Sequence, residues 1–173
     1  MARLGALNEA ELTAEQRAVY DTIKAGPRGR VSPPFLAWLR SPNFADRAQN
    51  LGAFLRFGTS LPRRVSELAI LVTARHWDCA YEWAAHTKDA LNAGLAQSVI
   101  DSLSRDEVPV FTAEDERAAY AYATSMHAHH KVDDKTYADA LAAFGLPGVV
   151  ELNGVIGYYI LMAVTLKSFE IMP

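Results

Sequence analysis

The stretch that decides the fold is ELAILVTARHWDCAYEWAAH, residues 67–86. It contains Glu67, the only cysteine of the chain (Cys79), a second carboxylate (Glu82) and His86. Cys79, Glu82 and His86 are spaced i, i+3 and i+7, and at about 100° per residue this spacing puts them on one side of a helix. Such a group of side chains could transfer protons, supply a thiolate or bind a metal ion.

Helix signals extend outward from this stretch in both directions, and no strand or hairpin pattern interrupts them. Thr13 followed by Gln16 is typical of a capping box, and Gly26-Pro27 predicts the end of that helix. The remaining predicted helices cover, in approximate bounds, residues 35–40, 42–57, 62–77, 79–93, 96–103, 113–130, 134–144 and 147–169. Thr112 and either Asp133 or Asp134 are the expected caps in the second half. The sequence therefore predicts an all-α fold.

Composition is compatible with one packed core. Half of the 173 residues are hydrophobic and 21% are charged, which is typical of a globular domain. We expect a single domain over residues 1–173, with N-terminal helices in 1–60, the core motif in 61–104 and C-terminal helices in 105–173. The last predicted helix is apolar around most of its circumference, so it is either central or part of a subunit interface.

Charge and hydropathy exclude several classes of partner. The net charge is −3, whereas a nucleic-acid interface needs a concentrated basic surface. The N-terminal residues lack the apolar region of a signal peptide, and no apolar run approaches the ~20 residues that span a bilayer. One cysteine excludes an intramolecular disulfide. We expect a soluble cytoplasmic protein that binds neither nucleic acid nor membrane.

The chemistry of the cluster follows from its position on the helix. If Asp78 is the N-cap, Cys79 occupies the first helical position, where the helix dipole favours a thiolate. Glu82 is four residues before His86 and is expected to orient the imidazole, as in many acid–base catalysts. Glu67 belongs to the preceding helix and would reach the same pocket if the two helices are antiparallel. A buried carboxylate there needs a polar partner.

Simpler interpretations stay open for the same residues. Cys79 could be a small buried hydrophobic residue, Glu82 and His86 an ordinary surface pair, and Glu67 a solvated residue. Zinc binding by Cys79, Glu82 and His86 is disfavoured because residues seven apart on one helix converge poorly on an ion. We expect no metal and no cofactor. A second histidine group, at positions 127, 129 and 130, is predicted to be a solvated helix end.

The sequence resembles a known family at three places. These are Glu67-Leu-Ala-Ile-Leu, then Tyr81-Glu82-Trp83-x-x-His86, then Ala90-x-x-Ala93-Gly94-Leu95. The pattern is similar to carboxymuconolactone decarboxylase-like proteins, in the superfamily that also holds alkylhydroperoxidase D-type proteins. The resemblance covers roughly residues 10–170. It implies an all-helical subunit that assembles as a homo-trimer or homo-hexamer.

The peroxidase branch of that superfamily uses a Cys-x-x-Cys pair with an upstream Glu and a downstream His. Glu67 and His86 match that Glu and that His, and Cys79 matches the first cysteine. Glu82 stands where the second cysteine would be, and Tyr81 replaces a relay histidine. The chain therefore resembles the branch that lacks the dithiol.

The resemblance implies acid–base chemistry, namely decarboxylation or a related lyase or isomerase step on a small carboxylated or lactone-type metabolite. His86 is the expected proton donor or base, with Glu82 and Glu67 assisting. Arg30 or Arg75 is expected to bind a substrate carboxylate, and the predicted substrate-binding set also includes, from the core motif, Tyr81 and Trp83. Two alternatives remain: a single-cysteine peroxidase acting through a sulfenic acid at Cys79, and a non-catalytic oligomeric binding protein.

Overall fold

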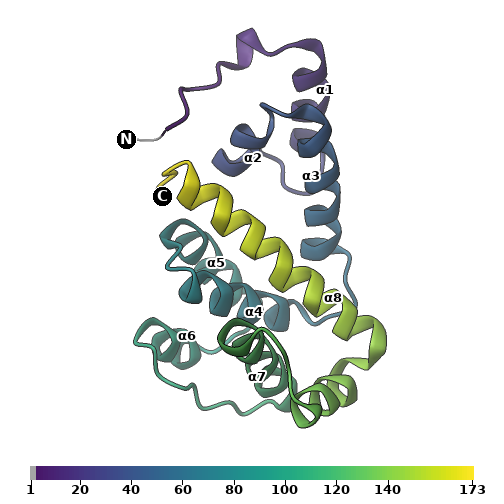
Figure 1. The fold of residues 1–173 in the computed structure, drawn as a ribbon, viewed down its shortest axis with the longest axis vertical. Helices are drawn as coiled ribbons and strands as arrows, with labels where there is room; N and C mark the ends of the chain where they lie inside the picture. Colours follow the sequence, from purple (N-terminus) through teal and green to yellow (C-terminus); the bar gives the residue numbers. More distant parts are fainter. Residues whose placement is uncertain (1–2) are drawn as a thin grey trace. The chain divides into compact units, whose positions relative to one another are not determined.

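The structure is a computed structural model that describes residues 3–173. The described residues contain helices and no strand, which confirms the all-α class (Figure 1). A short 3₁₀ helix, η1 (Glu9–Glu11), precedes the α-helices. These are α1 (Ala14–Ala25), α2 (Pro33–Trp38), α3 (Pro42–Phe57), α4 (Arg63–His76), α5 (Ala80–Asn92), α6 (Gln97–Ser104), α7 (Glu114–His129) and α8 (Asp134–Ser168).

The helices group into two compact units. The first unit is the chain up to Gly58 together with Val164–Met172, the end of α8. Its core contains Phe35 and Trp38, whose rings pack edge to face, and the exposed ring of Phe44 packs edge-on against Trp38. The indole Nε1 of Trp38 donates a hydrogen bond of 2.8 Å to Thr165 Oγ1, so the buried ring has its polar atom satisfied.

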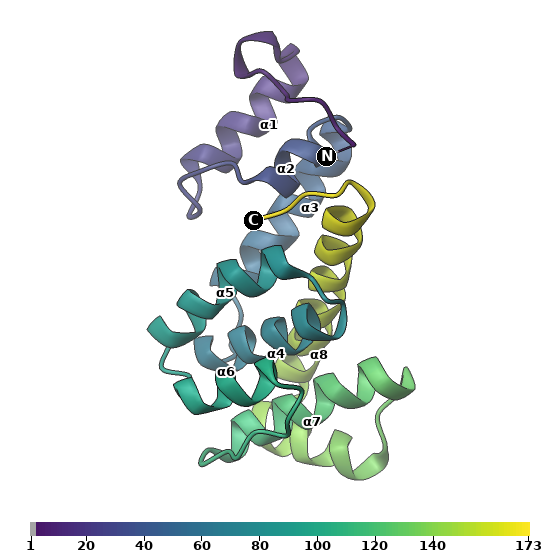
Figure 2. The same ribbon diagram turned by 90° about the vertical axis from the view of Figure 1, so that its left-hand side faces the viewer.

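The second unit is Thr59–Ala163, which holds α4 to α7 and most of α8. Helix α4 is its centre, because all ten residues from Val65 to Ala74 are buried. It packs against α5 and α7, as the two views in Figures 1 and 2 show. A helix buried around its whole circumference has no solvated side, so Glu67 on α4 must find polar partners inside the protein. The single domain over residues 1–173 stays a prediction.

Several predicted helix ends are confirmed. Thr13 and Gln16 form the capping box at the start of α1, and Gly58 is the residue that follows α3. Near the C-terminus, Gly145 has φ 64° and interrupts α8 two residues before Pro147. Asp133 caps the start of α8, since its Oδ1 accepts the backbone N–H of Thr136 at 2.8 Å.

The predicted cap at Asp78 is wrong. Asp78 ends α4 instead: it adopts a left-handed φ of 45°, and its N–H bonds to Arg75 O at 3.0 Å. The next N–H, of Cys79, bonds to Ala74 O at 2.8 Å. This pair of bonds is a Schellman motif, and Asp is one of the few non-glycine residues that tolerate its left-handed position. Cys79 is therefore the N-cap of α5 and not its first helical residue.

Two other helix starts differ from the prediction. Helix α7 begins after Ala113 and not after Thr112, and its first turn holds the acidic residues Glu114, Asp115 and Glu116. Their negative charges interact favourably with the positive end of the helix dipole, and this interaction stands in place of a side-chain cap. Helix α2 starts at Pro33, two residues before the predicted start, because proline suits the first helical positions.

Helix α8 corrects the expectation that no segment is long and apolar enough to span a membrane. By length and composition Asp134–Ser168 is such a segment. However, 56% of its apolar window is buried within the protein, as in the core helix of a globular domain, and Gly145 divides it.

Candidate active site

Three of the predicted site residues meet in the second unit. His86 on α5 lies between two carboxylates: its Nδ1 is 2.7 Å from Glu67 Oε2 on α4, and its Nε2 is 3.2 Å from Glu82 Oε2, one turn earlier on α5. Both ring nitrogens of His86 therefore face an oxygen. Because a neutral imidazole has one N–H and an imidazolium has two, this arrangement suits the protonated ring.

Burial makes these contacts strong. Glu67 is 0%, Glu82 2% and His86 3% exposed. Burial by itself disfavours the charged ring, but the hydrogen bonds and charges of Glu67 and Glu82 outweigh it and raise the pKa of His86. The cluster therefore favours the protonated form of a histidine that is shielded from water.

Two further residues complete the cluster, and the sequence analysis missed both. Arg63, one turn before Glu67 on α4, donates from Nε to Glu67 Oε1 at 2.8 Å. Its charge offsets that of the buried carboxylate. Tyr159 on α8 places its ring edge-on to the His86 ring, with centroids 4.9 Å apart. The i, i+4 spacing from Arg63 to Glu67 was a signal in the sequence for Arg63. The place of Tyr159 is revealed only by the packing of α8.

A metal-ligand group also exists at this place, although it is not the trio considered from sequence. Glu67, His86 and Asp89 offer ligand atoms that all lie within 4.8 Å of one another. A carboxylate–histidine–carboxylate set suits a divalent cation. Arg63 already supplies a positive charge at Glu67, so a cation would compete with this guanidinium.

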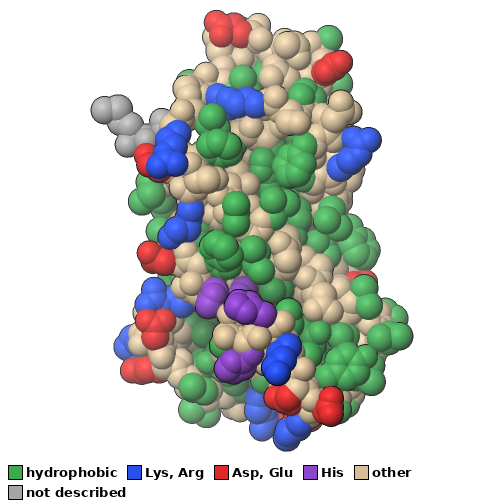
Figure 3. All heavy atoms as spheres, in the orientation of Figure 1, with side chains coloured by type: hydrophobic (Ala, Val, Ile, Leu, Met, Phe, Trp, Pro, Cys, Tyr) green, Lys and Arg blue, Asp and Glu red, His purple; other side chains and the backbone are tan. Residues whose placement is uncertain are grey.

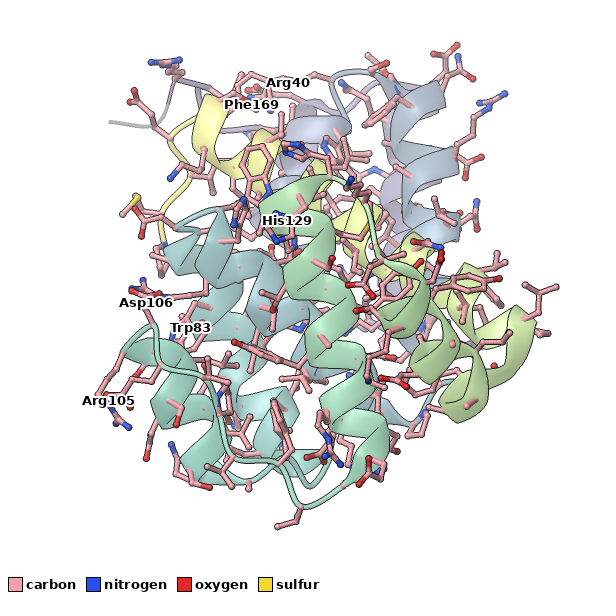
Figure 4. All side chains as sticks on the ribbon, turned by 60° about the horizontal axis from the view of Figure 1, so that its bottom comes forward. Arg40, Trp83, Arg105, Asp106, His129 and Phe169 are labelled. Carbon is pink, nitrogen blue, oxygen red and sulfur yellow. The ribbon has the colours of Figure 1, made fainter. Side chains whose placement is uncertain are left out.

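Cys79 lies beside a different hollow. It is buried and lines a space of about 180 Å³ together with Arg75, Asp78, Trp83 and others, but not with Glu82 or His86. Trp83 is labelled in Figure 4. The structure thus brings Glu67, Glu82 and His86 together and gives Cys79 and Trp83 separate surroundings.

Arg75, one of the two predicted carboxylate-binding arginines, pairs with a carboxylate outside the cluster. Arg75 makes a two-point contact with Asp106, in which Nε donates to Oδ1 at 2.8 Å, and this contact raises the pKa of Arg75. Arg30 is exposed and belongs to the first unit. Tyr81 is half-buried at the start of α5.

A second buried histidine stands near the end of α7. His127 is only 8% exposed, so the prediction of a solvated helix end is wrong for this residue, although His129 and His130 are exposed. Its Nε2 is 3.0 Å from Thr73 Oγ1, and its ring stacks on His76 with centroids 4.5 Å apart. Burial and the His76 ring lower the pKa of His127 to about 4. Figure 3 shows histidine side chains gathered on one face of the molecule.

The match to known families agrees with this site. Residues 42–125, which include Glu67, Glu82 and His86, match the model of the carboxymuconolactone decarboxylase family. Over these residues the chain is similar to the carboxymuconolactone decarboxylase family. A search of curated proteins returned no significant match.

Two solved structures show the same fold. One is a protein of unknown function from Agrobacterium tumefaciens, described as a candidate antioxidant defence protein AhpD. It has a TM-score of 0.68 and 22% identity, covering 79% of this chain and 94% of that one. The other is a cysteine-to-alanine variant of the debrominase Bmp8 in complex with 2,3,4-tribromopyrrole. It has a TM-score of 0.76 and 13% identity, covering 98% and 92% of the two chains. At these identities the likeness concerns the fold alone.

Proposed function

We propose that the protein is a cofactor-free acid–base enzyme that acts on a small carboxylated or lactone-type metabolite, by decarboxylation or a related lyase or isomerase step. The observation that supports this proposal is the buried His86 ring between Glu67 and Glu82. A histidine with a carboxylate at each nitrogen is both oriented and kept charged, which is what a proton donor requires.

The four charged groups form a chain in the order Arg63, Glu67, His86, Glu82. With every group ionised, the two positive and two negative charges cancel, which limits the cost of burying them. Glu67 and Arg63 fix the ring at Nδ1. The proton on Nε2 passes toward Glu82, whose second oxygen is the group that would meet the substrate.

The chemistry of decarboxylation matches such a chain. When the carbon–carbon bond to the carboxylate breaks, carbon dioxide leaves and the electron pair stays on the substrate as an enolate. Glu82, which takes up a proton from His86, then donates that proton to the carbon. Solvent later supplies a proton to His86. For an isomerisation the same pair would remove a proton and return it at another carbon. Arg30, Arg75, Tyr81 and Trp83 stay candidate contacts for the substrate.

The test is turnover of 4-carboxymuconolactone and related small lactone acids by matched variants. We expect His86→Gln and Glu82→Gln to lower the rate by about 10²- to 10⁴-fold, with the helical circular-dichroism spectrum preserved. Cys79→Ser is expected to keep the rate within about threefold, because a thiol takes no part in this proton transfer. Full turnover by His86→Gln would contradict the proposal.

A second candidate function rests on Cys79. Arg75 lines the same hollow as this thiol, and a nearby cation favours the thiolate. The thiolate would attack a peroxide oxygen, releasing an alcohol and leaving a sulfenic acid that an external thiol reduces. Mass spectrometry after dilute peroxide treatment should then show oxidation at Cys79, and Cys79→Ser should abolish peroxide reduction. A slowly alkylated, unoxidised thiol would remove this candidate.

We also propose that the protein is cytoplasmic and forms a homo-trimer or homo-hexamer. The support is apolar surface on α8, where Leu146 is 59% and Val150 62% exposed. Light scattering coupled to size-exclusion chromatography tests this assembly. An oligomer that turns over none of the lactone acids would favour the alternative of a non-catalytic oligomeric binding protein.

A further inference from the structure

Asp89 stands beside the His86 cluster and takes no part in the proton chain. It lies on α5, one turn after His86. A carboxylate oxygen of Asp89, one of Glu67 and a ring nitrogen of His86 all lie within 4.8 Å of one another. The three residues come from α4 and α5, which pack against each other, so rigid helices and not a loop hold these atoms together.

The three atoms have the chemistry and nearly the spacing of a metal-ligand set. Ligands arranged tetrahedrally around Zn²⁺ at about 2.0–2.2 Å lie roughly 3.4 Å apart, so shifts of about 1 Å would bring all three onto one ion. Imidazole and carboxylate together suit zinc and other divalent transition metals. Mg²⁺ prefers oxygen ligands alone and is therefore the poorer match.

The second nitrogen of His86 supports metal binding. Nδ1 faces Glu67 at 2.7 Å and Nε2 faces Glu82 at 3.2 Å, so an ion held together with Glu67 would take Nδ1. Nε2 would then carry the proton of the ring and donate it to Glu82. Metal-bound histidines usually donate their other N–H to a carboxylate or carbonyl in this way, because that bond fixes the ring and makes it a better ligand.

Access and charge set limits on such an ion. Glu67 and His86 are buried, whereas Asp89 is partly exposed, so an ion would arrive past Asp89 and displace the proton between His86 and Glu67. Arg63 donates to Oε1 of Glu67, while the contact with His86 uses Oε2. The guanidinium and the ion would therefore take different oxygens, and the charge of Arg63 lowers the affinity without filling the place of the ion.

We propose that Glu67, His86 and Asp89 bind a divalent transition-metal ion such as Zn²⁺, with Glu82 as the outer partner of His86. The ion and the Nδ1 proton of His86 exclude each other, because both need the same lone pair. A metal-bound ring that gave its remaining proton to Glu82 would become an imidazolate, so the ion stops proton transfer. This inhibition rests on the proposed function, whereas the binding site itself does not.

Calorimetry of the full-length protein with Zn²⁺ and with Mg²⁺ tests the site. The exposed His129 and His130 could bind zinc by themselves, so both are replaced by glutamine in every sample. We expect one Zn²⁺ per chain, Mg²⁺ binding that is weaker by at least about 100-fold, and zinc-induced NMR shifts at the His86 ring. Absence of zinc binding, or shifts confined to His76 and His127, would overturn the site.

Two variants should move the zinc affinity in opposite directions. Asp89→Asn removes a ligand and should weaken binding by at least about 100-fold, since outer-shell changes alone cost about 10- to 100-fold. Arg63→Gln removes the repelling charge and should strengthen binding about tenfold. The control is Asp101→Asn, at a half-buried position on α6, which should leave the affinity unchanged. Equal affinities in the two aspartate variants, or no gain in Arg63→Gln, would overturn the assigned ligands.

Two further readouts separate the ion from the proposed function. Nitrogen NMR should show Nδ1 of His86 without a proton in the zinc-bound protein, and a retained proton would overturn the exclusion. Where a lactone acid is turned over, saturating Zn²⁺ should stop turnover and EDTA should restore it, and unchanged turnover would likewise contradict the exclusion. If no lactone acid is turned over, the proposed function fails, while the calorimetric and NMR results still decide the metal site.

Discussion

The second unit contains two buried histidines that the protein treats in opposite ways. His86 is 3% and His127 8% exposed, so their burial is similar. His86 faces a carboxylate at each nitrogen, and these groups raise its pKa. His127 faces a hydroxyl and another imidazole, and its pKa falls to about 4. The partners favour the charged form of His86 and the surroundings favour the neutral form of His127.

The difference shows that partners decide the protonation state of a buried histidine, because burial alone favours the neutral form in both places. It also separates two kinds of chemistry within one small unit. His86 holds a proton that it can transfer, whereas His127 holds a lone pair that it can offer to a hydrogen-bond donor.

The largest expected effect on stability comes from removing Glu67, the buried carboxylate that pairs with His86 and Arg63. Glu67→Ala removes the carboxylate at Nδ1 of His86 and leaves both this ring and Arg63 without it. Breaking a buried ion pair from one side costs about 3–5 kcal/mol, so the free energy of unfolding should fall by this amount in urea denaturation at pH 7.

The control is Glu15→Ala, which removes an exposed glutamate from α1 and should change the free energy of unfolding by less than about 0.5 kcal/mol. An equal loss of unfolding free energy in the two variants would mean that the buried contacts of Glu67 add no stability beyond that of an exposed glutamate.

The second effect is a pH dependence of opposite sign at the two histidines. Below pH 6.5 the unfolded chain protonates His127 and the folded one does not until about pH 4, so stability should fall by up to about 3 kcal/mol over that interval. The raised pKa of His86 instead stabilises the fold fully below pH 6.5, and this contribution is lost as the pH rises through that raised value.

Urea unfolding at a series of pH values checks both statements. Subtracting the His127→Phe curve should isolate a difference on the acid side, and subtracting the His86→Gln curve should isolate one on the alkaline side. Difference curves that run parallel would remove the contrast between the two histidines.

The smallest effect concerns the partner of His127. The Thr73 hydroxyl donates its own proton to Ala69 O at 2.8 Å, so its oxygen accepts the Nε2 proton of His127. Thr73→Val keeps the shape of the side chain but removes this oxygen. The loss of this buried hydrogen bond should cost about 1–3 kcal/mol, and nitrogen NMR should show His127 changing to its other neutral tautomer. An unchanged tautomer would show that the hydrogen bond to Thr73 does not set it.

Much of the fold could be predicted from local signals. The capping box at Thr13 and the break at Gly145 depend on residues next to each other in sequence, so periodicity and turn chemistry were sufficient. Asp78 misled the prediction because Asp suits both an N-cap and the left-handed end of a helix. The choice depended on the Schellman bonds that close α4.

In the candidate site, too, some contacts could be predicted from local sequence and others could not. Glu82 and His86 are one turn apart on α5, so their contact could be predicted from spacing. The approach of Glu67 was expected if α4 and α5 were antiparallel, and the structure shows it. Tyr159 and the burial of His127 could not be predicted, because they depend on how α8 and α7 pack, which local sequence does not encode. The contacts proposed for Arg30, Arg75, Tyr81 and Trp83 stay predictions.

The central claim is that two carboxylates keep a transferable proton on His86, and the most direct measurement is an NMR titration of the histidine ring nitrogens in the intact protein. The account predicts that both nitrogens of His86 stay protonated through pH 6.5 and above, while His127 in the same sample stays neutral down to about pH 4. A His86 ring that is neutral at pH 6.5 would contradict the account.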